Sequence, residues 1–240
     1  MIEKITENKP DIITVKNLSK RYGRKVVFDN LSFSLPRNKI IGLLGENGIG
    51  KTTLLRLMAD LLKPDGGEIL IDGGKVAHKT ARDKVSFLLD PAYLYSFMTV
   101  KSAIQYYKDF YEDFDCGKAM RLCEDFGLAQ NIKQSVKKLS KGNKERLYLL
   151  LNLSRKVPVY LLDEPIAGLD PKFKRDLIKA FLSNIGENAT LIISSHLLRD
   201  LDPIFDYIAI MKKNEIITAN SEDIRAQGKS IEDFYLEVIG

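Results

Sequence analysis

One stretch of nine residues, Gly45–Thr53, constrains the fold of this chain more than any other feature. It reads Gly-Glu-Asn-Gly-Ile-Gly-Lys-Thr-Thr and fits the pattern Gly, four residues, Gly, Lys, then Ser or Thr. Glycines let a backbone wrap closely round a polyphosphate, with successive N–H groups pointing inward. In this pattern the lysine places its charge on the β- and γ-phosphates, and the hydroxyl after it binds Mg²⁺. The stretch therefore predicts a phosphate-binding loop whose ligand contacts come from Gly45, Glu46, Asn47, Gly48, Ile49, Gly50, Lys51, Thr52 and Thr53.

The segments on either side of this loop match what such a loop requires. The apolar run Ile40–Leu44 predicts a buried strand before the loop, and apolar residues at helical spacing follow it as far as Leu62. Pro64 then ends the run. A strand, the loop and a helix in this order are typical of P-loop nucleotide hydrolases. The loop by itself leaves kinases, GTPases, helicases and transport ATPases open.

Length, composition and charge limit the class of protein further. A chain of 240 residues with 45% hydrophobic residues can bury a substantial core in one domain. The sequence has no apolar run near the ~18 residues needed to cross a bilayer, and its first ten residues lack the apolar centre of a signal peptide. We therefore expect a cytosolic or peripheral protein. The net charge of +5 suits an anionic ligand but does not argue for nucleic acid.

Short alternating segments predict a second layer of strands beside the main sheet. Such segments are Ile12–Lys16, Val26–Phe28 and Leu31–Leu35, with Leu18–Gly23 expected to lead into a turn. We expect them to form an antiparallel β-layer. Further strands are predicted at Glu68–Gly73 and Val85–Leu89.

The pattern changes between about Thr99 and Leu139, where no strand signal occurs. Thr99 is expected to cap a helix with an aromatic stripe on one face. The stripe fits either the core of a helical subdomain or a docking surface for a partner, and it comprises Tyr106, Tyr107, Phe110, Tyr111 and Phe114.

A second potential anion site lies at Ser140. This residue is a good N-cap for the apolar helix that follows, and a capped helix start with lysines beside it can bind an anion. A nucleic-acid surface is the rival interpretation of these lysines, but no stacking aromatic residues lie among them. The lysines in question are Lys133, Lys137, Lys138, Lys141 and Lys144.

Two adjacent carboxylates follow a buried strand, Val159–Leu162. In an α/β sheet, ligands bind at the C-terminal ends of the strands. Asp163 is placed there to hold Mg²⁺, and Glu164 to take a proton from an attacking water. Pro171 is expected to open an amphipathic helix at its first position. Another buried strand, residues 190–195, ends at His196.

The order of these motifs resembles the ATP-binding subunit of an ABC transporter. The motifs are the loop at 45, Leu-Ser-x-Gly at 139, Asp-Glu-Pro at 163, Gly-Leu-Asp at 168 and Ser-Ser-His at 194. The resemblance covers residues 12–238. It implies a single α/β domain over 1–240: a P-loop core sheet, an N-terminal antiparallel β-layer and an inserted helical subdomain at about 91–156. It also implies MgATP hydrolysis coupled to export through an integral membrane permease on a separate chain, at the cytoplasmic face of the membrane.

The resemblance further implies roles for individual residues. In this family two ATPase subunits pack head to tail, and each ATP lies between the loop of one and the signature of the other. Lys51, Glu164 and His196 would then serve catalysis, with His196 at the γ-phosphate and the attacking water. Thr52 and Asp163 would hold the metal. The remaining nucleotide contacts would come from Tyr22 at the adenine, from Ser140, Gly142 and Asn143 at the partner's γ-phosphate, and from Asp170 in the loop that crosses the dimer.

Two positions depart from the family pattern. Lys141 and Asn143 stand where the usual signature, Leu-Ser-Gly-Gly-Gln, has its third and fifth residues. Asp90 stands where the family usually has a glutamine that senses Mg²⁺ and touches the permease. Asp90 is a candidate metal ligand, but we expect its main role to be coupling to the permease. Both departures resemble bacterial exporter-type ATPases.

A soluble ABC ATPase that switches ribosomes or DNA is the alternative function. Such proteins usually carry two ATPase units in one chain or a long coiled-coil insertion, whereas this sequence has one loop, one signature and no heptad run. A non-hydrolysing ATP sensor fits less well because Glu164 and His196 are both present. Transport is favoured, and no nucleic-acid partner is expected. The substrate, the direction of transport and the choice of homodimer or heterodimer stay open.

Overall fold

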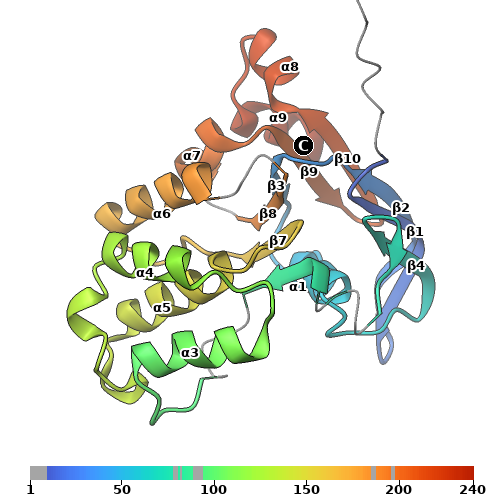
Figure 1. Ribbon diagram of the computed structural model, residues 1–240. Coiled ribbons are helices and arrows are strands. Elements are labelled where there is room, and N and C mark those ends of the chain that lie inside the picture. Colours follow the sequence, from blue (N-terminus) through green and yellow to red (C-terminus); the bar gives the residue numbers. More distant parts are fainter. Residues whose placement is uncertain (1–9, 78–80, 82, 89–93, 185–187, 196–197) are drawn as a thin grey trace, which may run out of the picture.

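A computed structural model describes residues 10–77, 81, 83–88, 94–184, 188–195 and 198–240. Figure 1 shows three parts: a small antiparallel sheet at one side, a helical part at the other, and a central sheet between them. The α/β fold and the antiparallel layer predicted from the sequence are confirmed.

The central sheet contains six strands in the order β10-β9-β3-β8-β7-β6. The strands β3, β6, β7, β8 and β9 run parallel, and β10 pairs antiparallel with β9 at one edge. The carboxyl ends of β3, β7 and β8 therefore meet at one edge of the sheet, where ligands bind in open α/β folds. The strands are β3 (Ile40–Leu44), β6 (Val85–Phe87), β7 (Val159–Asp163), β8 (Thr190–Ser194), β9 (Tyr207–Lys212) and β10 (Glu215–Asn220).

Both faces of the central sheet are buried, which explains its continuous apolar runs. In β7, Tyr160 and Leu162 belong to one core cluster and Leu161 to the other. The first cluster includes the helical part, and the second includes α1 and the antiparallel sheet. Strand β9 was not predicted from the sequence, although its residues Ile208 and Ala209 are fully buried.

The antiparallel sheet has the order β2-β1-β4-β5, with β1 (Ile13–Tyr22), β2 (Lys25–Leu35), β4 (Gly66–Ile71) and β5 (Gly74–Lys75). The turn into which Leu18–Gly23 was expected to lead is present at residues 23–24, where Gly23 has φ of 57°. The first strand is longer than predicted, because β1 continues to Tyr22, and the two predicted segments after the turn form one strand. The alternation is broken by Asn17 and Asn30, which adopt φ of 51° and 60° in strands with shifted register. Asparagine tolerates this conformation, and such irregularities are β-bulges that leave the strand intact.

Helix α1 (Lys51–Met58) packs its apolar face into the second core cluster. It ends at Met58, four residues before the predicted limit at Leu62. Asp60 has φ of 57°, a left-handed conformation that a helix cannot continue through.

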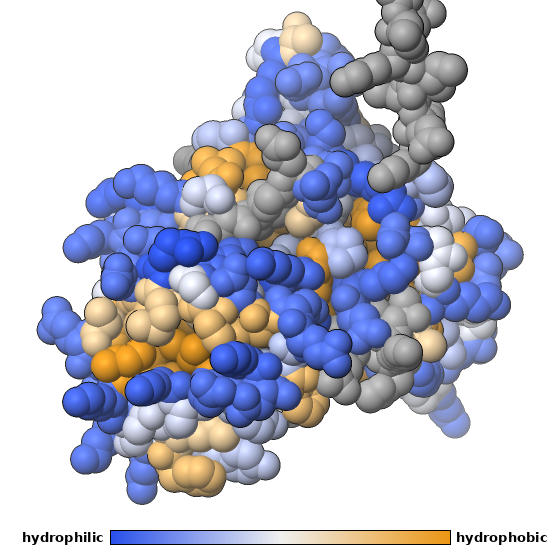
Figure 2. All heavy atoms as spheres, in the orientation of Figure 1, coloured by the Kyte–Doolittle hydropathy of each residue, from blue (hydrophilic) through white to orange (hydrophobic). Residues whose placement is uncertain are grey.

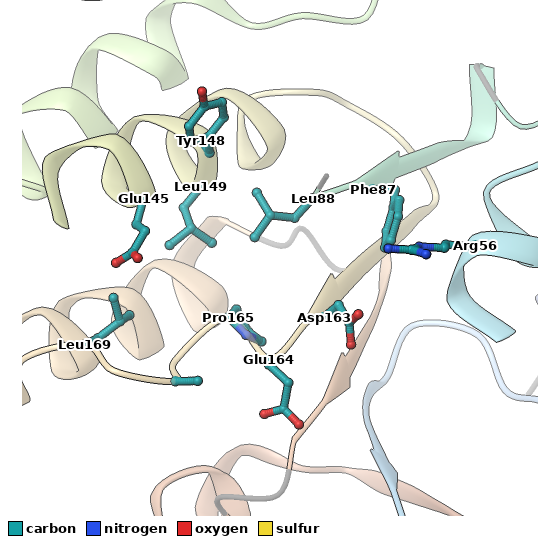
Figure 3. Close-up of a pocket in the computed structure, with 11 residues that line it drawn as sticks. Arg56, Phe87, Leu88, Glu145, Tyr148, Leu149, Asp163, Glu164, Pro165 and Leu169 are labelled. Carbon is teal, nitrogen blue, oxygen red and sulfur yellow. The ribbon is translucent and has the colours of Figure 1, made fainter. Parts of the chain in front are cut away.

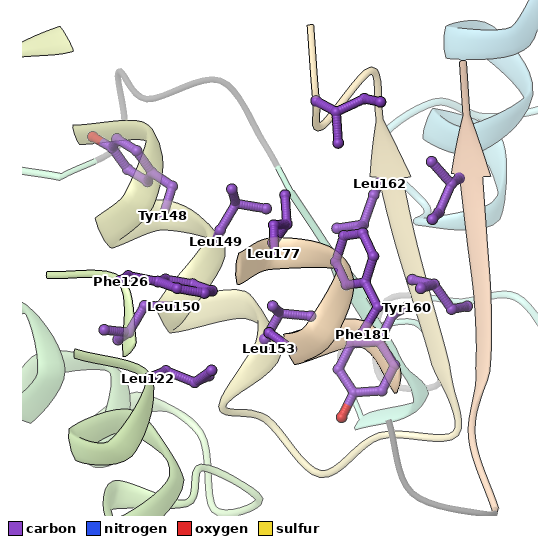
Figure 4. Close-up of a cluster of buried hydrophobic side chains, with 14 of the residues drawn as sticks. Leu122, Phe126, Tyr148, Leu149, Leu150, Leu153, Tyr160, Leu162, Leu177 and Phe181 are labelled. Atoms are coloured by element: carbon purple, nitrogen blue, oxygen red, sulfur yellow. The ribbon is translucent and has the colours of Figure 1, made fainter. Parts of the chain in front are cut away.

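The helical part lies between β6 and β7 in the chain and contains α3 (Val100–Phe110), α4 (Cys116–Asp125) and α5 (Lys141–Leu153), with η2 (Ala129–Asn131) and η3 (Val136–Lys138). The predicted caps are confirmed, since Thr99 forms a capping box on α3 and Ser140 caps α5. Figure 4 shows α4, α5, α6 and β7 sharing one apolar cluster. The aromatic stripe divides: Tyr107 and Phe114 pack against the core, whereas Tyr106 and Phe110 are exposed.

The rest of the chain covers and closes the central sheet. It contains α6 (Pro171–Asn184), α7 (Leu198–Leu201), η4 (Asp202–Ile204), α8 (Ser221–Ala226) and α9 (Ile231–Ile239). Pro171 opens α6 as predicted. Figure 2 shows mostly polar residues on the visible face, with hydrophobic residues gathered over the helical part.

Candidate functional site

The phosphate-binding loop connects β3 to α1, as the sequence predicts. Gly45 and Gly50 have φ of 153° and 121°. A β-carbon at Gly45 would lie 2.9 Å from the carbonyl oxygen of Met211, and one at Gly50 would lie 2.9 Å from Val27 Cγ1. Glycine is therefore required at both positions by conformation and by space.

Lys51 is folded back over this loop. Its Nζ donates to the carbonyl oxygens of Gly45 (2.7 Å) and Glu46 (3.1 Å), and the residue is only 7% exposed. Burial lowers the pKa of Lys51, while the negative charges of Glu164 and Asp163 act in the opposite direction. The loop thus holds a desolvated lysine close to both carboxylates, and a desolvated charge interacts strongly with a bound anion.

Asp163 is held by two hydroxyl groups at the end of β7. Thr52 Oγ1 donates to Asp163 Oδ2 (2.6 Å), and Ser194 Oγ donates to Asp163 Oδ1 (2.5 Å). Asp163 pairs with Ser194 in the parallel register of β7 and β8. The sequence analysis gave Ser194 no role of its own. The sequence does show a hydroxyl residue at the end of a buried strand. It does not show the strand register that places this hydroxyl beside Asp163.

Glu164 follows with φ of 49°, in the left-handed region. Its backbone N–H donates to the carbonyl oxygen of Ser194 and to Ser194 Oγ, both at 3.1 Å. Non-glycine residues in this conformation are strained and are frequent in active sites. Figure 3 shows Asp163 and Glu164 side by side at a pocket of about 350 Å³, which is also lined by Glu145, Tyr148 and Leu149 of α5.

The signature residues lie at the start of α5 and are accessible. Ser140 Oγ accepts from the backbone N–H of Asn143 (3.2 Å), and the side chain of Lys141 is 93% exposed. A β-carbon at Gly142 would meet no neighbouring atom within 4 Å in the described part of the chain. Among the described residues, no hydrogen bond or ion pair joins Ser140, Gly142 or Asn143 to the phosphate-binding loop.

The other predicted site residues are more scattered. Asp170 caps the start of α6, because its Oδ1 accepts from the N–H of Phe173 (2.9 Å). Tyr22 ends β1 and is 46% exposed, and Lys20 Nζ lies 5.9 Å from the centroid of its ring. Asp90 and His196 lie outside the described residues.

The structure brings several of the predicted site residues together. A glycine-rich loop with its lysine, a hydroxyl and two carboxylates occupy one edge of the sheet. The oxygens of Thr52 and Asp163 are hard ligands of the kind that Mg²⁺ prefers. The chemistry fits a nucleoside triphosphate and its metal.

Comparison with known proteins gives the family. Residues 28–167, more than half of the chain, match the family described as ABC transporter. The chain belongs to the ABC transporter family. An ABC transporter ATP-binding protein of Bacillus subtilis, the uncharacterized YcbN, is 32% identical over 95% of this chain and 74% of its own length.

Further matches agree with this assignment. The lantibiotic transport ATP-binding protein SrtF of Streptococcus pyogenes is 27% identical over 88% of this chain and 92% of its own length. A solved ATP-binding subunit of an ABC transporter superposes with a TM-score of 0.85 at 24% identity, covering 95% of this chain and all of that one. At that identity the likeness shows the fold alone.

The family assignment confirms the main functional prediction. The chain is an ATP-binding subunit of an ABC transporter and an ATPase that hydrolyses ATP to power transport. ABC ATP-binding subunits dimerise and work with membrane permeases. In the described part of this chain, no helix is both long and apolar enough to span a membrane.

Proposed function

We propose that this ABC ATPase hydrolyses MgATP in a head-to-tail dimer and thereby drives export through a permease on a separate chain, at the cytoplasmic face of the membrane. The observation that carries the proposal is the separation of the two motifs. At the phosphate-binding loop, Lys51 donates to the carbonyl oxygen of Gly45 and Thr52 donates to Asp163. On α5, Ser140 is exposed, and a β-carbon at Gly142 would meet no described atom within 4 Å. A second subunit would supply the missing half of each site.

Each site residue then has a defined task. Backbone N–H groups of the loop and Lys51 would bind the phosphates, and Tyr22 would stack on the adenine. Mg²⁺, held by Thr52 and Asp163, would neutralise charge on the phosphates. Glu164 would accept the proton of the attacking water, and His196 would orient that water at the γ-phosphate. The partner's Ser140, Gly142 and Asn143 would complete the phosphate cage.

We further propose that residues 1–240 act as one ATPase domain, with the helical part at about 91–156 transmitting motion to the permease. Two exposed aromatic pairs support a docking role for this part. Tyr95 and Phe97 stack at 5.4 Å, and Tyr106 and Phe110 at 6.0 Å. Export is favoured because the relative SrtF, which matches along most of its length, is named for lantibiotic transport.

The experiment is purification of the tagged chain from native membranes, followed by identification of integral proteins that accompany it. We expect a permease, and we expect its reconstitution in lipid vesicles to change the ATPase rate. Recovery with ribosomes or DNA and without an integral protein would favour the soluble switch instead.

Asp90 provides a finer test of coupling. Mg²⁺ keeps several waters and has Thr52 and the phosphates as ligands, so losing one carboxylate should cost it little. Asp90→Ala should leave ATPase activity of the isolated subunit within several-fold of normal but remove the response to the permease, and Asp90→Gln should restore much of that response. A sharply raised Mg²⁺ requirement in isolated Asp90→Ala would instead identify a metal ligand.

A further inference from the structure

Two segments of the helical part, residues 95–101 and 132–138, lie side by side although they are far apart in the chain. The bridge between Thr99 and Ser135 is antiparallel. Four backbone hydrogen bonds of 2.7–3.1 Å also join the segments, namely those from Lys101 to Ile132, Val100 to Gln134, Val136 to Met98 and Lys137 to Ser96. The start of α3 and the region of η3 are therefore one continuous piece of surface.

Two aromatic rings stand out from the first of these segments. Tyr95 and Phe97 are 57% and 74% exposed, and their rings stack with centroids 5.4 Å apart. Phe97 is the most exposed large hydrophobic residue in the described part of the chain. Contiguous exposed apolar side chains mark contacts with a membrane or with another molecule.

Lysines without acidic neighbours accompany the two rings. Residues 94–108 and 126–144 contain seven lysines and no Asp or Glu. Four of these lysines lie in the paired segments, are exposed and form no ion pair among the described residues: Lys101, Lys133, Lys137 and Lys138. We call these four lysines, with Tyr95 and Phe97, the basic–aromatic patch. No aromatic residue lies among Lys133–Lys138 along the sequence, and only the fold brings the rings beside them.

The positive charge of the chain is concentrated in the same part of the molecule. Residues 94–156 carry twelve Lys and Arg against seven Asp and Glu, an excess of five that equals the net charge of the whole chain. The remainder of the chain is therefore neutral overall. A local excess of one sign of charge attracts a surface of the opposite sign, so the basic–aromatic patch suits an anionic surface.

The other exposed aromatic pair of the helical part has different surroundings. Tyr106 and Phe110 stack on α3 beside Asp109. Residues 109–115 carry four acids and no Lys or Arg. An anionic surface would be repelled there, so this pair remains assigned to the permease, and only the rings of the basic–aromatic patch lie in a positive environment.

We propose that the basic–aromatic patch binds the anionic lipid headgroups of the membrane surface and so holds the helical part against the bilayer beside the permease. The inference rests on the proposed function for the location of the subunit at the membrane. Basic residues close to an anionic leaflet are attracted to it, and amphipathic aromatic rings favour the level of the headgroups. Lysine is a flexible point charge, which suits mobile headgroups better than a ligand of fixed shape.

Single-stranded nucleic acid is the rival occupant, because it also binds lysines and exposed rings. The rings of Tyr95 and Phe97 are inclined by only 20° and stack on each other, so one face of each ring is already covered. Residues 94–108 and 126–144 also contain no arginine, the side chain that both stacks and grips phosphate with two hydrogen bonds. Both features favour a lipid surface.

The test is flotation of the full chain with two kinds of vesicle, one of phosphatidylcholine alone and one of equal parts phosphatidylcholine and phosphatidylglycerol. The main variant replaces Lys133, Lys137 and Lys138 by Gln, and a second variant replaces the same three by Arg. The matched control removes the same charge from exposed positions on α6 and in the turn after β9, by Lys172→Gln, Lys179→Gln and Lys213→Gln.

The unaltered chain should bind the anionic vesicles and not the neutral ones, and binding should fall as salt is added. The main variant should bind about 100-fold more weakly, since each lysine near an anionic surface contributes a factor of about five. The arginine variant and the control should bind as the unaltered chain does. The ATPase rate in solution and the thermal midpoint of the main variant should not change, because its three lysines are exposed and form no ion pair among the described residues.

The aromatic rings are tested separately. Tyr95→Ser with Phe97→Ser should weaken binding to the anionic vesicles about 10-fold, and the loss should persist at high salt because burial of apolar surface is not electrostatic. Leu182→Ser with Leu236→Ser is the control, since these leucines are 59% and 57% exposed on other helices. An equal loss in the leucine control would overturn the role of the rings.

Equal binding to both kinds of vesicle, equal losses in the two glutamine variants, or lost binding in the arginine variant would overturn the proposal. A thermal midpoint that falls together with binding in the main variant would do the same, because the lysines would then be structural. Tighter binding of a fluorescent oligouridine than of the anionic vesicles would overturn it in favour of nucleic acid.

The vesicles contain no permease, so this inference and the proposed function can fail separately. A chain that recovers a permease from native membranes but does not bind anionic vesicles loses only the inference about the basic–aromatic patch. A chain that binds the vesicles through these lysines but recovers no permease keeps the lipid contact and loses the proposed partner.

Discussion

At the phosphate-binding loop, Lys51 is 7% exposed and donates to two carbonyl oxygens. At the signature, the side chain of Lys141 is 93% exposed, and its Nζ lies 3.9 Å from Glu145 Oε1. The glycines differ in the same way. A β-carbon at Gly50 would lie within about 3 Å of Val27 and Phe28, and one at Gly142 would meet open space in the described structure. The fold itself therefore requires the glycines of the first motif, whereas in the described residues the second motif is tied to its own subunit mainly by the cap that Ser140 places on α5.

The contrast shows that one motif is fixed by contacts within its own subunit and the other is not. The loop residues are fixed by their own subunit, so their loss should damage folding and nucleotide binding together. The signature residues make few contacts within their own subunit. Their loss should therefore leave the fold intact and impair assembly with a second subunit.

The largest effect concerns Glu164, which lines the pocket at the end of β7. Glu164→Gln should keep ATP binding and lose ~10²-fold or more of turnover, because the amide cannot accept the proton. Glu145→Gln is the matched control, since Glu145 lines the same pocket from α5 and is assigned no role in the proposed chemistry. Steady-state ATPase assays would contradict the assignment if Glu164→Gln turned over near the normal rate.

The two glycines give the next test. Gly50→Ala should lower the free energy of unfolding by about 2–3 kcal/mol, because a methyl group would clash at a φ that alanine avoids. Gly142→Ala should leave it unchanged or raise it by about 0.5–1 kcal/mol, because alanine favours helices. Urea unfolding of both variants measures the difference. Equal losses of stability would remove the contrast between the two motifs.

Ser194→Ala should lower the free energy of unfolding by about 1–2 kcal/mol. The substitution removes a hydrogen bond to Asp163 and an acceptor for the N–H of Glu164. Turnover should fall as well, since both carboxylates lose an anchor. Ser183→Ala is the control, because Ser183 Oγ donates to the carbonyl oxygen of Lys179 in its own helix and lies away from the two carboxylates in the sequence. Chemical unfolding and ATPase assays should both show a loss for Ser194→Ala and none for Ser183→Ala. Unchanged stability and turnover in Ser194→Ala would show that the contact between Ser194 and Asp163 is incidental.

The smallest effect belongs to the signature. Ser140→Ala removes a helix cap and should lower the free energy of unfolding by about 1 kcal/mol or less. Its effect on ATP-dependent assembly should be much larger than its effect on stability. Calorimetric unfolding together with an assembly assay checks this ratio. A stability loss as large as that of Gly50→Ala would mean that Ser140 is a structural residue of its own subunit.

The sequence could predict the parts whose causes are local. The loop, the caps at Thr99 and Ser140, the strand ending in Asp163 and the opening of α6 at Pro171 all follow from short patterns, and the structure contains them. Family resemblance added the family and ATP as the ligand, which the family match supports.

The remaining features depend on contacts between distant segments. The register that sets Ser194 against Asp163 and the stacking of Arg146 on Phe173 join residues far apart in the chain, so no local pattern encodes them. The bulges at Asn17 and Asn30 and the early end of α1 were missed because a tolerated positive φ looks like ordinary polar sequence.

Sedimentation velocity of Glu164→Gln with MgATP, with and without Ser140→Arg, tests the central claim most directly. The account predicts a monomer without nucleotide and a shift to dimer when ATP is added, since bound ATP completes each shared site. Ser140→Arg should abolish the shift without reducing ATP binding, because bulk and charge would stand where the partner's phosphate must lie. A double variant that still dimerises on ATP would contradict a site divided between two subunits.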